Sequence, residues 1–322
     1  MKVLIARFSS IGDVVLTTPV IRCVKKQVPN CEVHFVTKKA FAGLVKTNPY
    51  IDKVWELKDD FNTLVNELKS ENFDVLIDLH NNLRTKRLRF NLGIKRLALD
   101  KINLQKWLIV NLKVNRLPDV HIVQRNLDVV KSLGVVDDQQ GLDYFIPPNT
   151  EIPATIELPQ TFVCYAIGGQ HATKKMPLKR IVELCSTINQ PVVLIGGKED
   201  TDVGAQIEAT CNHVISLCGQ LSIDQSALII DRSQWLITHD TGMMHIGAAL
   251  GKRIASIWGN TIPEFGMYPY RSDTASQVFE VNGLSCRPCS KIGHEKCPKG
   301  HFQCMMNQNL EEIASLIHTT AG

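Results

Sequence analysis

Hydrophobic positions in the first half of the chain form short apolar runs, separated by stretches in which apolar residues recur every three or four positions. The runs predict buried strands, and the stretches between them predict amphipathic helices. We expect strands at residues 3–7, 32–36, 54–57 and 73–79, and helices at 13–26, 39–46, 62–71 and 121–133. Strands that alternate with helices are typical of βαβ units and a parallel sheet.

The same alternation restarts after a proline-rich stretch near the midpoint, residues 146–153, with Pro159 close behind. Proline density of this kind is typical of a linker between domains. Beyond it we expect strands at residues 161–167, 191–195, 214–217, 235–238 and 253–258, and helices at 178–189, 201–210, 223–230, 242–250 and 310–318. The pattern predicts an α/β protein of two similar domains, 1–150 and 151–322, that face a central cleft. The last helix, 310–318, is a candidate for packing back on the first domain.

Length and composition agree with this division. The chain has 322 residues, 44% of them hydrophobic, which suits two globular domains of about 150 residues each. No apolar run reaches the roughly 18 residues that a membrane span needs. The apolar run at residues 3–7 is too short for the core of a signal peptide, so we expect a cytoplasmic protein.

Positive charge gathers in one stretch of the first half. Between Arg84 and Arg116 the chain has ten lysines and arginines and one acid, Asp100. Such a block is either a solvated helix face or a surface for an anionic partner, such as a phosphorylated glycolipid, membrane headgroups or nucleic acid. Its aromatic residues are only Phe90 and Trp107, so the stacking platform of a single-stranded nucleic-acid binder is missing.

Candidate chemistry lies in four loops that follow predicted strands, where the sheets of α/β proteins bind their ligands. In the first, residues 7–13, Ser9, Ser10 and Gly12 suit a tight turn, and Asp13 is the one carboxylate. Asp13 is either the N-cap of the next helix or a general base.

The second loop contains Gly168, Gly169, Lys174 and Lys175. Paired glycines let backbone amides approach an oxyanion, and a lysine behind them supplies positive charge. The loop lacks the spacing G-x-x-x-x-G-K-[ST], and the chain contains no G-x-G-x-x-G. A P-loop NTPase and a classical NAD or FAD enzyme are therefore disfavoured.

The third loop again pairs glycines with acids, and its Glu199 either holds ribose hydroxyls or belongs to a turn before a helix. The fourth passes from a strand to a helix through Asp240, Thr241 and Gly242, with His245 one turn further on. The start of a helix presents free N–H groups and the positive end of its dipole, which favours a phosphate. The alternative is a helix capped by Asp240, with a buried histidine. Because three of the four loops lie in the second half, we expect the donor nucleotide there.

Cysteines are numerous, and four of the ten form a cluster near the end of the chain. The other six are scattered singly and are expected to be reduced core residues. The cluster is Cys286, Cys289, Cys297 and Cys304. A C-x-x-C pair followed by two more cysteines has the ligand types of a structural zinc site. The alternatives are reduced thiols that close a loop, and a disulfide.

Three stretches occur in the order VLIARFSSIGDVVLTTPVI, GGQHATKKMP and HDTGMMHIGAALGKRIASIWGNTIP. Together they resemble glycosyltransferase family 9, the heptosyltransferases, and the resemblance covers essentially the whole chain. It is most specific in the segment Asp-Thr-Gly-x-x-His. The resemblance implies the GT-B fold of two Rossmann-like domains, and an inverting transfer of heptose from ADP-heptose to the inner core of lipopolysaccharide. It also implies that catalysis needs no metal or cofactor, which leaves a structural zinc as the open question.

The resemblance also assigns roles. Asp13 becomes the general base on the acceptor hydroxyl, and Lys174 neutralises the departing diphosphate. Lys-Lys-Met-Pro stands where the family has Lys-Arg-Trp-Pro, so Lys175 is an alternative phosphate contact. The other expected donor contacts are Gly168, Gly169, Glu199 at the ribose, Leu221 at the adenine, Asp240, Thr241, Gly242 and His245. The expected acceptor contacts are Ser10, Gly12, Arg84, Arg87 and Arg89, because Kdo carboxylates and lipid A phosphates are anionic.

One base and one stabilised leaving group suffice for an inverting displacement. The facing carboxylate pair of a retaining glycosidase is not evident. The expected partners are the nucleotide-sugar donor, an anionic glycolipid acceptor and the inner membrane surface, with no nucleic acid. A family member that uses another nucleotide-sugar or a surface-glycan acceptor is the main alternative. A zinc-stapled nucleic-acid binder and a nicotinamide oxidoreductase are disfavoured.

Overall fold

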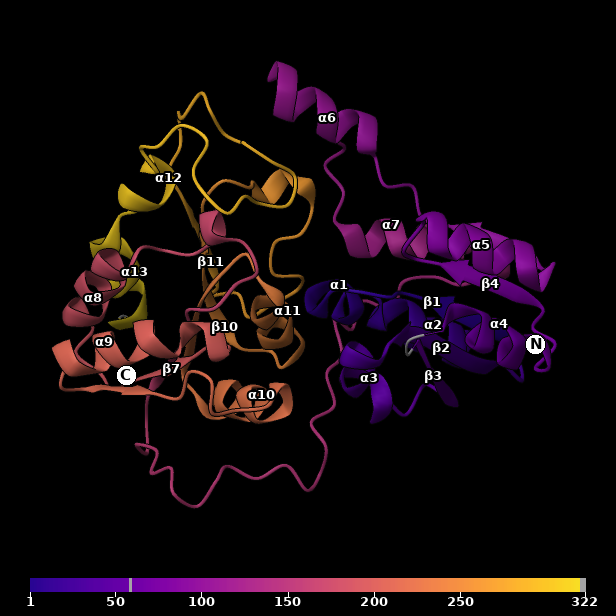
Figure 1. The fold of residues 1–322 in the computed structure, drawn as a ribbon, viewed down its shortest axis with the longest axis horizontal. Helices are drawn as coiled ribbons and strands as arrows, with labels where there is room; N and C mark the ends of the chain where they lie inside the picture. Colours follow the sequence, from indigo (N-terminus) through magenta and orange to yellow (C-terminus); the bar gives the residue numbers. More distant parts are fainter. Residues whose placement is uncertain (58–59, 319–322) are drawn as a thin grey trace. The chain divides into compact units, whose positions relative to one another are not determined.

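The computed structural model describes residues 1–57 and 60–318 (Figure 1). The chain divides into two compact units. Unit 1 consists of Met1–Ile102 and Val120–Phe145, and unit 2 consists of Asn103–Asp119 together with the chain from Ile146 onward. The last passage from unit 1 to unit 2 thus follows Phe145, close to the boundary expected at residue 150.

In the described residues, the sheet of unit 1 has five parallel strands in the order β3-β2-β1-β4-β5. They are β1 (Lys2–Ala6), β2 (Glu32–Lys38), β3 (Lys53–Leu57), β4 (Val75–Asp78) and β5 (Lys95–Ala98). All of β4 and nearly all of β1 are buried. Parallel strands covered on both faces are expected to be continuously apolar, as β1 is from Val3 to Ala6 and β4 is from Val75 to Ile77. Because β1 and β4 are neighbours, the loops that follow them share one edge of the sheet.

The helices of unit 1 largely follow the predicted pattern, but the helices expected at 13–26 and 121–133 are each divided in two. They are α1 (Ile11–Val15), α2 (Thr18–Gln27), α3 (Lys39–Lys46), α4 (Phe61–Lys69), α5 (Leu83–Leu92), α7 (Ile122–Asp128) and the 3₁₀ turn η1 (Lys131–Leu133). The helix expected at 13–26 is divided between α1 and α2. Pro19 lies in the first turn of α2, where a helix does not need the N–H that proline lacks, so α2 starts anew at this point. Within the basic block, α5, β5 and the helix α6 (Asn103–Leu112) were not predicted.

A buried arginine fastens the returning segment of unit 1 to its core. Arg22 on α2 is 1% exposed. It donates to both carboxylate oxygens of Asp138, at 2.7 and 2.8 Å, and to the carbonyl of Gly141 at 2.9 Å. It also pairs with Asp143. A buried charge must keep its partners, so residues 138–143 are held firmly against α2.

In the described residues, unit 2 has a six-stranded parallel sheet in the order β11-β10-β9-β6-β7-β8. Its strands are β6 (Val163–Ala166), β7 (Val192–Ile195), β8 (Val214–Ser216), β9 (Trp235–His239), β10 (Arg253–Trp258) and β11 (Gln277–Glu280). Its helices are α6 (Asn103–Leu112), α8 (Leu178–Thr187), α9 (Thr201–Thr210), α10 (Ile223–Arg232), α11 (Gly242–Ala249), α12 (Gln303–Met306) and α13 (Leu310–His318). The 3₁₀ turns are η2 (Ala172–Lys174), η3 (Lys198–Asp200) and η4 (Pro263–Phe265).

The helix α6 belongs to unit 2, although the sequence pattern placed all of residues 1–150 in the first domain. Ile109 on α6 packs against Ile262 and Phe265. Just beyond the helix, the Lys113 ammonium donates to the carbonyl of Cys286 at 3.0 Å. These contacts join residues far apart in the sequence, so local periodicity cannot reveal them.

The last helix, α13, was a candidate for packing back on the first domain, and in the structure it packs within unit 2. Ile313 and Ile317 are fully buried in the hydrophobic core of unit 2. The helix lies beside α8 (Figure 1). Among the described residues, every helix is too short or too polar to span a lipid bilayer.

Candidate active site

Asp13 lies in the first turn of α1, just beyond the carboxyl end of β1. Its Oδ2 accepts hydrogen bonds from the backbone N–H and the hydroxyl of Ser10, at 3.1 and 2.8 Å. Its Oδ1 lies 2.5 Å from Nη2 of Arg7, and the side chain is 26% exposed. The N-cap is Ser10, Gly12 is buried in the helix, and Asp13 closes the cap from within the first turn. One carboxylate oxygen therefore serves the helix, and the other faces a cation.

Two opposing effects set the pKa of Asp13. Burial raises it, because the charged carboxylate loses water, but the charge of Arg7 and the hydrogen bonds from Ser10 lower it by more. The net result is a pKa below the ordinary value of 3.8. Asp13 is therefore ionised at neutral pH and able to accept a proton, and Arg7 limits its basicity.

Arg7 and His80 complete this loop, and neither was a sequence candidate. The Arg7 guanidinium donates to the carbonyl of Ser9 at 2.8 Å and to that of Leu79 at 2.6 Å, so it bridges the loops after β1 and β4. His80 Nδ1 accepts the backbone N–H of Phe8 at 3.3 Å. Burial, assisted by the charge of Arg7, lowers the pKa of His80 to about 4, so its ring is neutral at pH 7. The adjacency of β1 and β4 is the signal that would have found both residues.

A lysine and a carboxylate predicted from separate loops meet in unit 2. Lys174 Nζ lies 2.5 Å from Asp240 Oδ2 and donates to the Asp240 carbonyl at 3.2 Å. The hydroxyl of Thr261 donates to the same Oδ2 at 2.8 Å. These residues follow β6, β9 and β10, which are consecutive in the sheet. Neighbouring strand ends thus gather a cation, a carboxylate and a hydroxyl at one point.

Lys175 points to a different carboxylate. Its Nζ lies 3.0 Å from Asp200 Oδ1, and Asp200 Oδ2 accepts the N–H of Gly197 at 3.0 Å. A Cβ at Gly168 would lie 2.6 Å from Asp200 Oδ2, and a Cβ at Gly169 would lie 3.3 Å from the Lys175 side chain, so both glycines keep the loops closely packed. In this geometry Lys174, and not Lys175, reaches the Asp240 turn.

The start of α11 has the features of an anion site. Its N-cap is Thr241, whose side chain makes no capping hydrogen bond, and Gly242 is the first helical residue. The carboxylate of Asp240 is engaged in the contacts described above and does not cap the helix. The N–H groups of the first turn and the positive helix end therefore favour an anion. His245, expected at the donor, is 2% exposed.

A buried histidine connects β9 to the loop that contains Lys174 and Lys175, here called the lysine loop. His239 is 0% exposed, and its Nε2 accepts the backbone N–H of Met176 at 3.1 Å. Burial, and to a lesser extent the charge of Lys175, lowers the pKa of His239 to about 3. The neutral ring accepts at Nε2 and so carries its proton on Nδ1. Because His239 directly precedes Asp240, this bond helps to fix the lysine loop relative to the Asp240 turn.

The weaker donor candidates lie on the same edge of the sheet but further along it. Glu199 is exposed in η3 after β7, and Leu221 is partly buried after β8. These strands are one and two places from β6. Both residues therefore lie in loops at the same edge of the sheet as the Lys174–Asp240 contact, but outside that contact.

The predicted acceptor arginines on α5 point in different directions. The guanidinium of Arg84 lies 5.4 Å from the centre of the Phe8 ring, beside the loop after β1. That of Arg87 lies 5.0 Å from the Phe61 ring, at the start of α4. Arg89 is exposed. Of the three, Arg84 has the clear structural link to the loop that contains Asp13.

The cysteine-rich segment, residues 286–304, packs against two loops of unit 2, the lysine loop and the loop after β10. Thr173 in η2 donates its N–H to the carbonyl of His294 at 3.1 Å, and its hydroxyl accepts the N–H of His294 at 2.8 Å. Arg287 donates to the carbonyls of Gly259 at 2.6 Å and Thr261 at 2.8 Å. The segment therefore braces both the lysine loop and the loop after β10.

The four cysteines of this segment do not form a ready metal site. All ten cysteines are free thiols, so the structure does not show the disulfide alternative. Although all four are described, no three of their sulfur atoms lie within 4.8 Å of one another. Burial raises the pKa of Cys289 to about 11 and that of Cys304 to about 12, which keeps both thiols neutral at pH 7.

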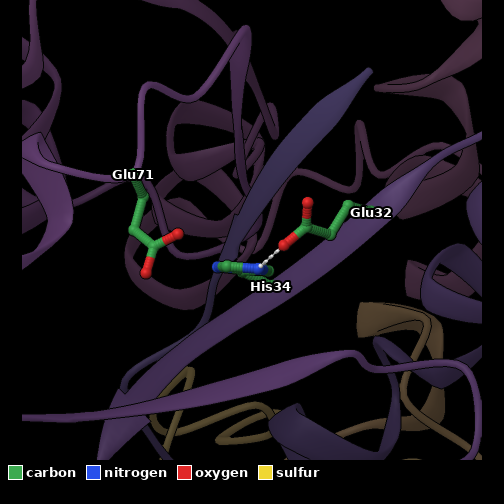
Figure 2. A group of neighbouring side chains, drawn as sticks. All are labelled: Glu32, His34 and Glu71. Carbon is green, nitrogen blue, oxygen red and sulfur yellow. Dashed lines mark hydrogen bonds and ion pairs between the residues drawn. The ribbon is translucent and has the colours of Figure 1, made fainter.

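One group among the described residues does have metal-like spacing, and it lies in unit 1: Glu32, His34 and Glu71 (Figure 2). His34 is buried, and its Nε2 lies 2.7 Å from Glu32 Oε1 (Figure 2). Its Nδ1 accepts the indole N–H of Trp55 at 3.0 Å. The imidazole proton is therefore on Nε2, where it is donated to Glu32, and both ring nitrogens are in use.

Lysines neutralise the two glutamates of this group. Lys2 Nζ lies 2.9 Å from Glu71 and 3.3 Å from Glu32, and Lys53 Nζ lies 2.6 Å from Glu71. Lys2, Glu32 and Lys53 each begin a strand. The group thus lies at the amino ends of the strands, opposite the edge where α/β sheets bind ligands. We interpret it as an ion-pair network that joins three strands.

The chain is similar to known proteins over most of its length. A sequence profile of glycosyltransferase family 9 (heptosyltransferase) matches residues 61–299. The chain is 23% identical over 312 residues to lipooligosaccharide heptosyltransferase 2 of Haemophilus influenzae, covering 88% of this chain and 90% of that one. It is 22% identical over 289 residues to lipopolysaccharide heptosyltransferase 1 of Escherichia coli, covering 82% and 89%.

A solved structure of similar fold is ADP-heptose lps heptosyltransferase II of E. coli. It superposes with a TM-score of 0.72 at 18% identity, covering 99% of this chain and 98% of that one. At this identity the likeness establishes the fold alone. The predicted α/β architecture of the GT-B class, with two parallel sheets, is confirmed.

Proposed function

The chain belongs to glycosyltransferase family 9, the heptosyltransferases, and from this premise we propose that it transfers heptose from ADP-heptose to the inner core of lipopolysaccharide. The sequence-based assignment to this family, and to the glycosyltransferases as enzymes, is confirmed. The choice of sugar is supported by the relatives, which are named as heptosyltransferases. A related nucleotide-sugar or a surface-glycan acceptor is the alternative.

The observation that carries the proposal is the meeting of Lys174, Asp240 and the start of α11 in unit 2. An ammonium group next to the N–H groups of an uncapped helix start suits the two charges of a diphosphate. Asp240 holds Lys174 in place and is itself held by Thr261. This arrangement stabilises the negative charge that develops as the diphosphate departs.

In the proposed reaction, the acceptor hydroxyl attacks the anomeric carbon from the side opposite the diphosphate. The new C–O bond forms as the bond between the sugar and the β-phosphate oxygen breaks, and its electron pair leaves with ADP. Asp13 accepts the hydroxyl proton. A single displacement of this kind inverts the anomeric configuration and needs one base.

The reaction assigns a role to the other contacts. Gly168, Gly169, Lys175, Thr241 and Gly242 shape the phosphate loops, Glu199 and Leu221 lie along the path of the nucleoside, and His245 supports α11 from within. On the acceptor side, Ser10 and Gly12 form the loop of the base, and Arg84, Arg87 and Arg89 offer charge to acidic sugars and phosphates. We place this activity in the cytoplasm, at the inner membrane surface.

We further propose that catalysis is metal-independent and that residues 286–304 act as a structural brace. A structural zinc held by Cys286, Cys289, Cys297 and Cys304 would require their sulfur atoms to lie closer together than they do here. Metal analysis of the purified protein tests this role. A chelator should leave the rate of ADP release unchanged, and inhibition that added zinc reverses would contradict metal-independent catalysis.

The decisive experiment mixes purified protein with ADP-heptose and a Kdo-lipid A acceptor. We expect ADP release and a gain of one heptose in the acceptor mass. A screen of nucleotide-sugars by thermal shift checks the donor, because only a ligand that binds the native state raises the melting temperature. Stabilisation and turnover with a different nucleotide-sugar alone would replace ADP-heptose with that donor.

A further inference from the structure

The two most exposed large hydrophobic side chains among the described residues both lie on α5. Leu83 is 85% exposed and Phe90 is 81% exposed. A helix advances by about 100° per residue, so side chains seven positions apart share a face. The buried residues of α5, Thr85 and Leu88, lie on the opposite face. The helix is therefore anchored on one side and presents Leu83 and Phe90 outward.

Basic side chains flank this apolar pair. On the same geometry, Lys86 and Arg87 lie on either side of the line from Leu83 to Phe90, about one-sixth of a turn away or less. Both are exposed, and the sequence of α5 contains no acid. Long basic side chains can lie along an apolar surface while their charged ends reach outward. The exposed face of α5 thus has an apolar centre and a positive border.

Charge and size favour an anionic lipid surface over other partners. A nucleic acid would pair with the basic border but would leave Leu83 and Phe90 in water. Two copies of α5 would bring like charges together, and one short helix offers far less than the roughly 800 Å² per partner of a stable protein interface. Anionic headgroups above acyl chains complement both features at once.

We propose that α5 is the membrane-docking element of this enzyme. Leu83 and Phe90 insert at the boundary between headgroups and acyl chains, and Lys86 lies among the headgroup phosphates. The proposal rests on the proposed function for its purpose, since the acceptor is a glycolipid. On the same helix, Arg84 lies over Phe8 in the loop of Asp13. Docking through α5 therefore brings the loop of the base to the level of the headgroups.

Flotation with lipid vesicles tests the docking without any substrate. The full chain is mixed with vesicles of phosphatidylethanolamine and phosphatidylglycerol, and separately with vesicles of neutral phosphatidylcholine. We expect binding to the anionic vesicles that weakens in high salt. The double variant Leu83→Ser/Phe90→Ser should lose at least about tenfold in partition constant. Lys86→Gln should lose up to about fivefold.

Val136→Ser is the matched control, because Val136 is 67% exposed on the same unit but lies outside α5. It should change vesicle binding by less than about twofold, and all variants should keep the wild-type melting temperature, as exposed substitutions usually do. The proposal would be overturned if wild-type protein does not bind anionic vesicles, or if the double variant binds them as well as wild type does. So would equal binding to neutral vesicles, or a dimer in solution that the double variant abolishes.

Two activity measurements separate this proposal from the proposed function. The double variant should transfer heptose normally to a delipidated, water-soluble acceptor, because Leu83 and Phe90 are not among the proposed acceptor contacts. It should lose most of its transfer to the same acceptor embedded in vesicles. If wild-type protein modifies neither acceptor, the proposed function fails, while vesicle binding still decides the role of α5.

Discussion

The loops after β1 in unit 1 and after β6 in unit 2 hold equivalent places in two parallel sheets. The candidate reactive side chains of the two loops, however, have opposite charges. In unit 1 the reactive candidate is an acid, Asp13, held 2.5 Å from Arg7. In unit 2 it is a cation, Lys174, held 2.5 Å from Asp240. Each group is fixed by a partner of the opposite sign. The same scaffold therefore presents the proposed proton acceptor in one unit and the proposed phosphate-binding cation in the other.

The supporting contacts are also parallel. In unit 1, His80 from the loop after β4 accepts the N–H of Phe8. In unit 2, His239 at the end of β9 accepts the N–H of Met176. In both units a neutral histidine from the neighbouring strand thus fastens the first loop. The two side chains differ in how far they extend. Asp13 hydrogen-bonds within its own helix cap, whereas the long side chain of Lys174 extends to the end of the neighbouring strand.

The comparison is tested most strongly by Asp13→Asn, which keeps the shape of the side chain but cannot accept the proton. We expect the rate of ADP release to fall by about 10²–10⁴-fold. Binding of ADP, measured by calorimetry, should be unchanged, because the donor loops belong to unit 2. Ser10→Ala is the matched control, since it removes one hydrogen bond and leaves the carboxylate. A rate for Asp13→Asn within tenfold of wild type would remove Asp13 from the role of base.

The corresponding test in unit 2 compares Lys174→Met with Lys175→Met. Lys174 is the lysine at the Asp240 turn, so its loss should lower the turnover rate by about 10²–10³-fold. Lys175 pairs with Asp200, and its loss should act mainly on loop packing, with less than about a tenfold effect on turnover. Steady-state kinetics with ADP-heptose separates the two. Equal losses would contradict the assignment of the phosphate contact to Lys174.

The fold could be predicted from the sequence because its signals are local. Buried parallel strands are continuous apolar runs, and the helices between them have helical spacing, so most elements were predicted nearly in place. The errors come from distant contacts. The anchors of α6 lie at Ile262 and Phe265, more than a hundred residues away, and α13 is held by the core of unit 2.

The candidate site shows the same limit. Asp13, Lys174 and Asp240 were predicted individually, because each follows a strand and has suitable chemistry. Two residues that hold these loops were not predicted: Arg7 is the last residue of the strand expected at 3–7, and His239 directly follows the strand expected at 235–238. Contacts between these loops depend on which strands are neighbours in the sheet, and strand order cannot be read from local periodicity.

A smaller effect is expected at the histidine that fastens the lysine loop. His239→Leu leaves the N–H of Met176 buried without an acceptor, which should cost about 1–3 kcal/mol in the free energy of unfolding. The displaced loop should also lower kcat/KM for the donor by about tenfold. His239→Gln can return an acceptor oxygen to the same place and should recover most of both losses. Denaturant unfolding and kinetics check this, and a Gln variant as impaired as the Leu variant would argue against the hydrogen bond.

The smallest predicted effect is a shift along the pH axis at Arg7. Burial alone would raise the pKa of Asp13, and the positive charge of Arg7 is the main influence that lowers it. Arg7→Gln should therefore raise that pKa. Because the reaction needs ionised Asp13, activity is lost as the pH falls through its pKa, and the acid limb of kcat/KM should move to higher pH. Well above that limb the variant should stay within a few-fold of wild type, since a less acidic carboxyl group is the stronger base. An acid limb that does not move would show that Arg7 does not set the basicity of Asp13, and the symmetry of the two ion pairs would then be structural only.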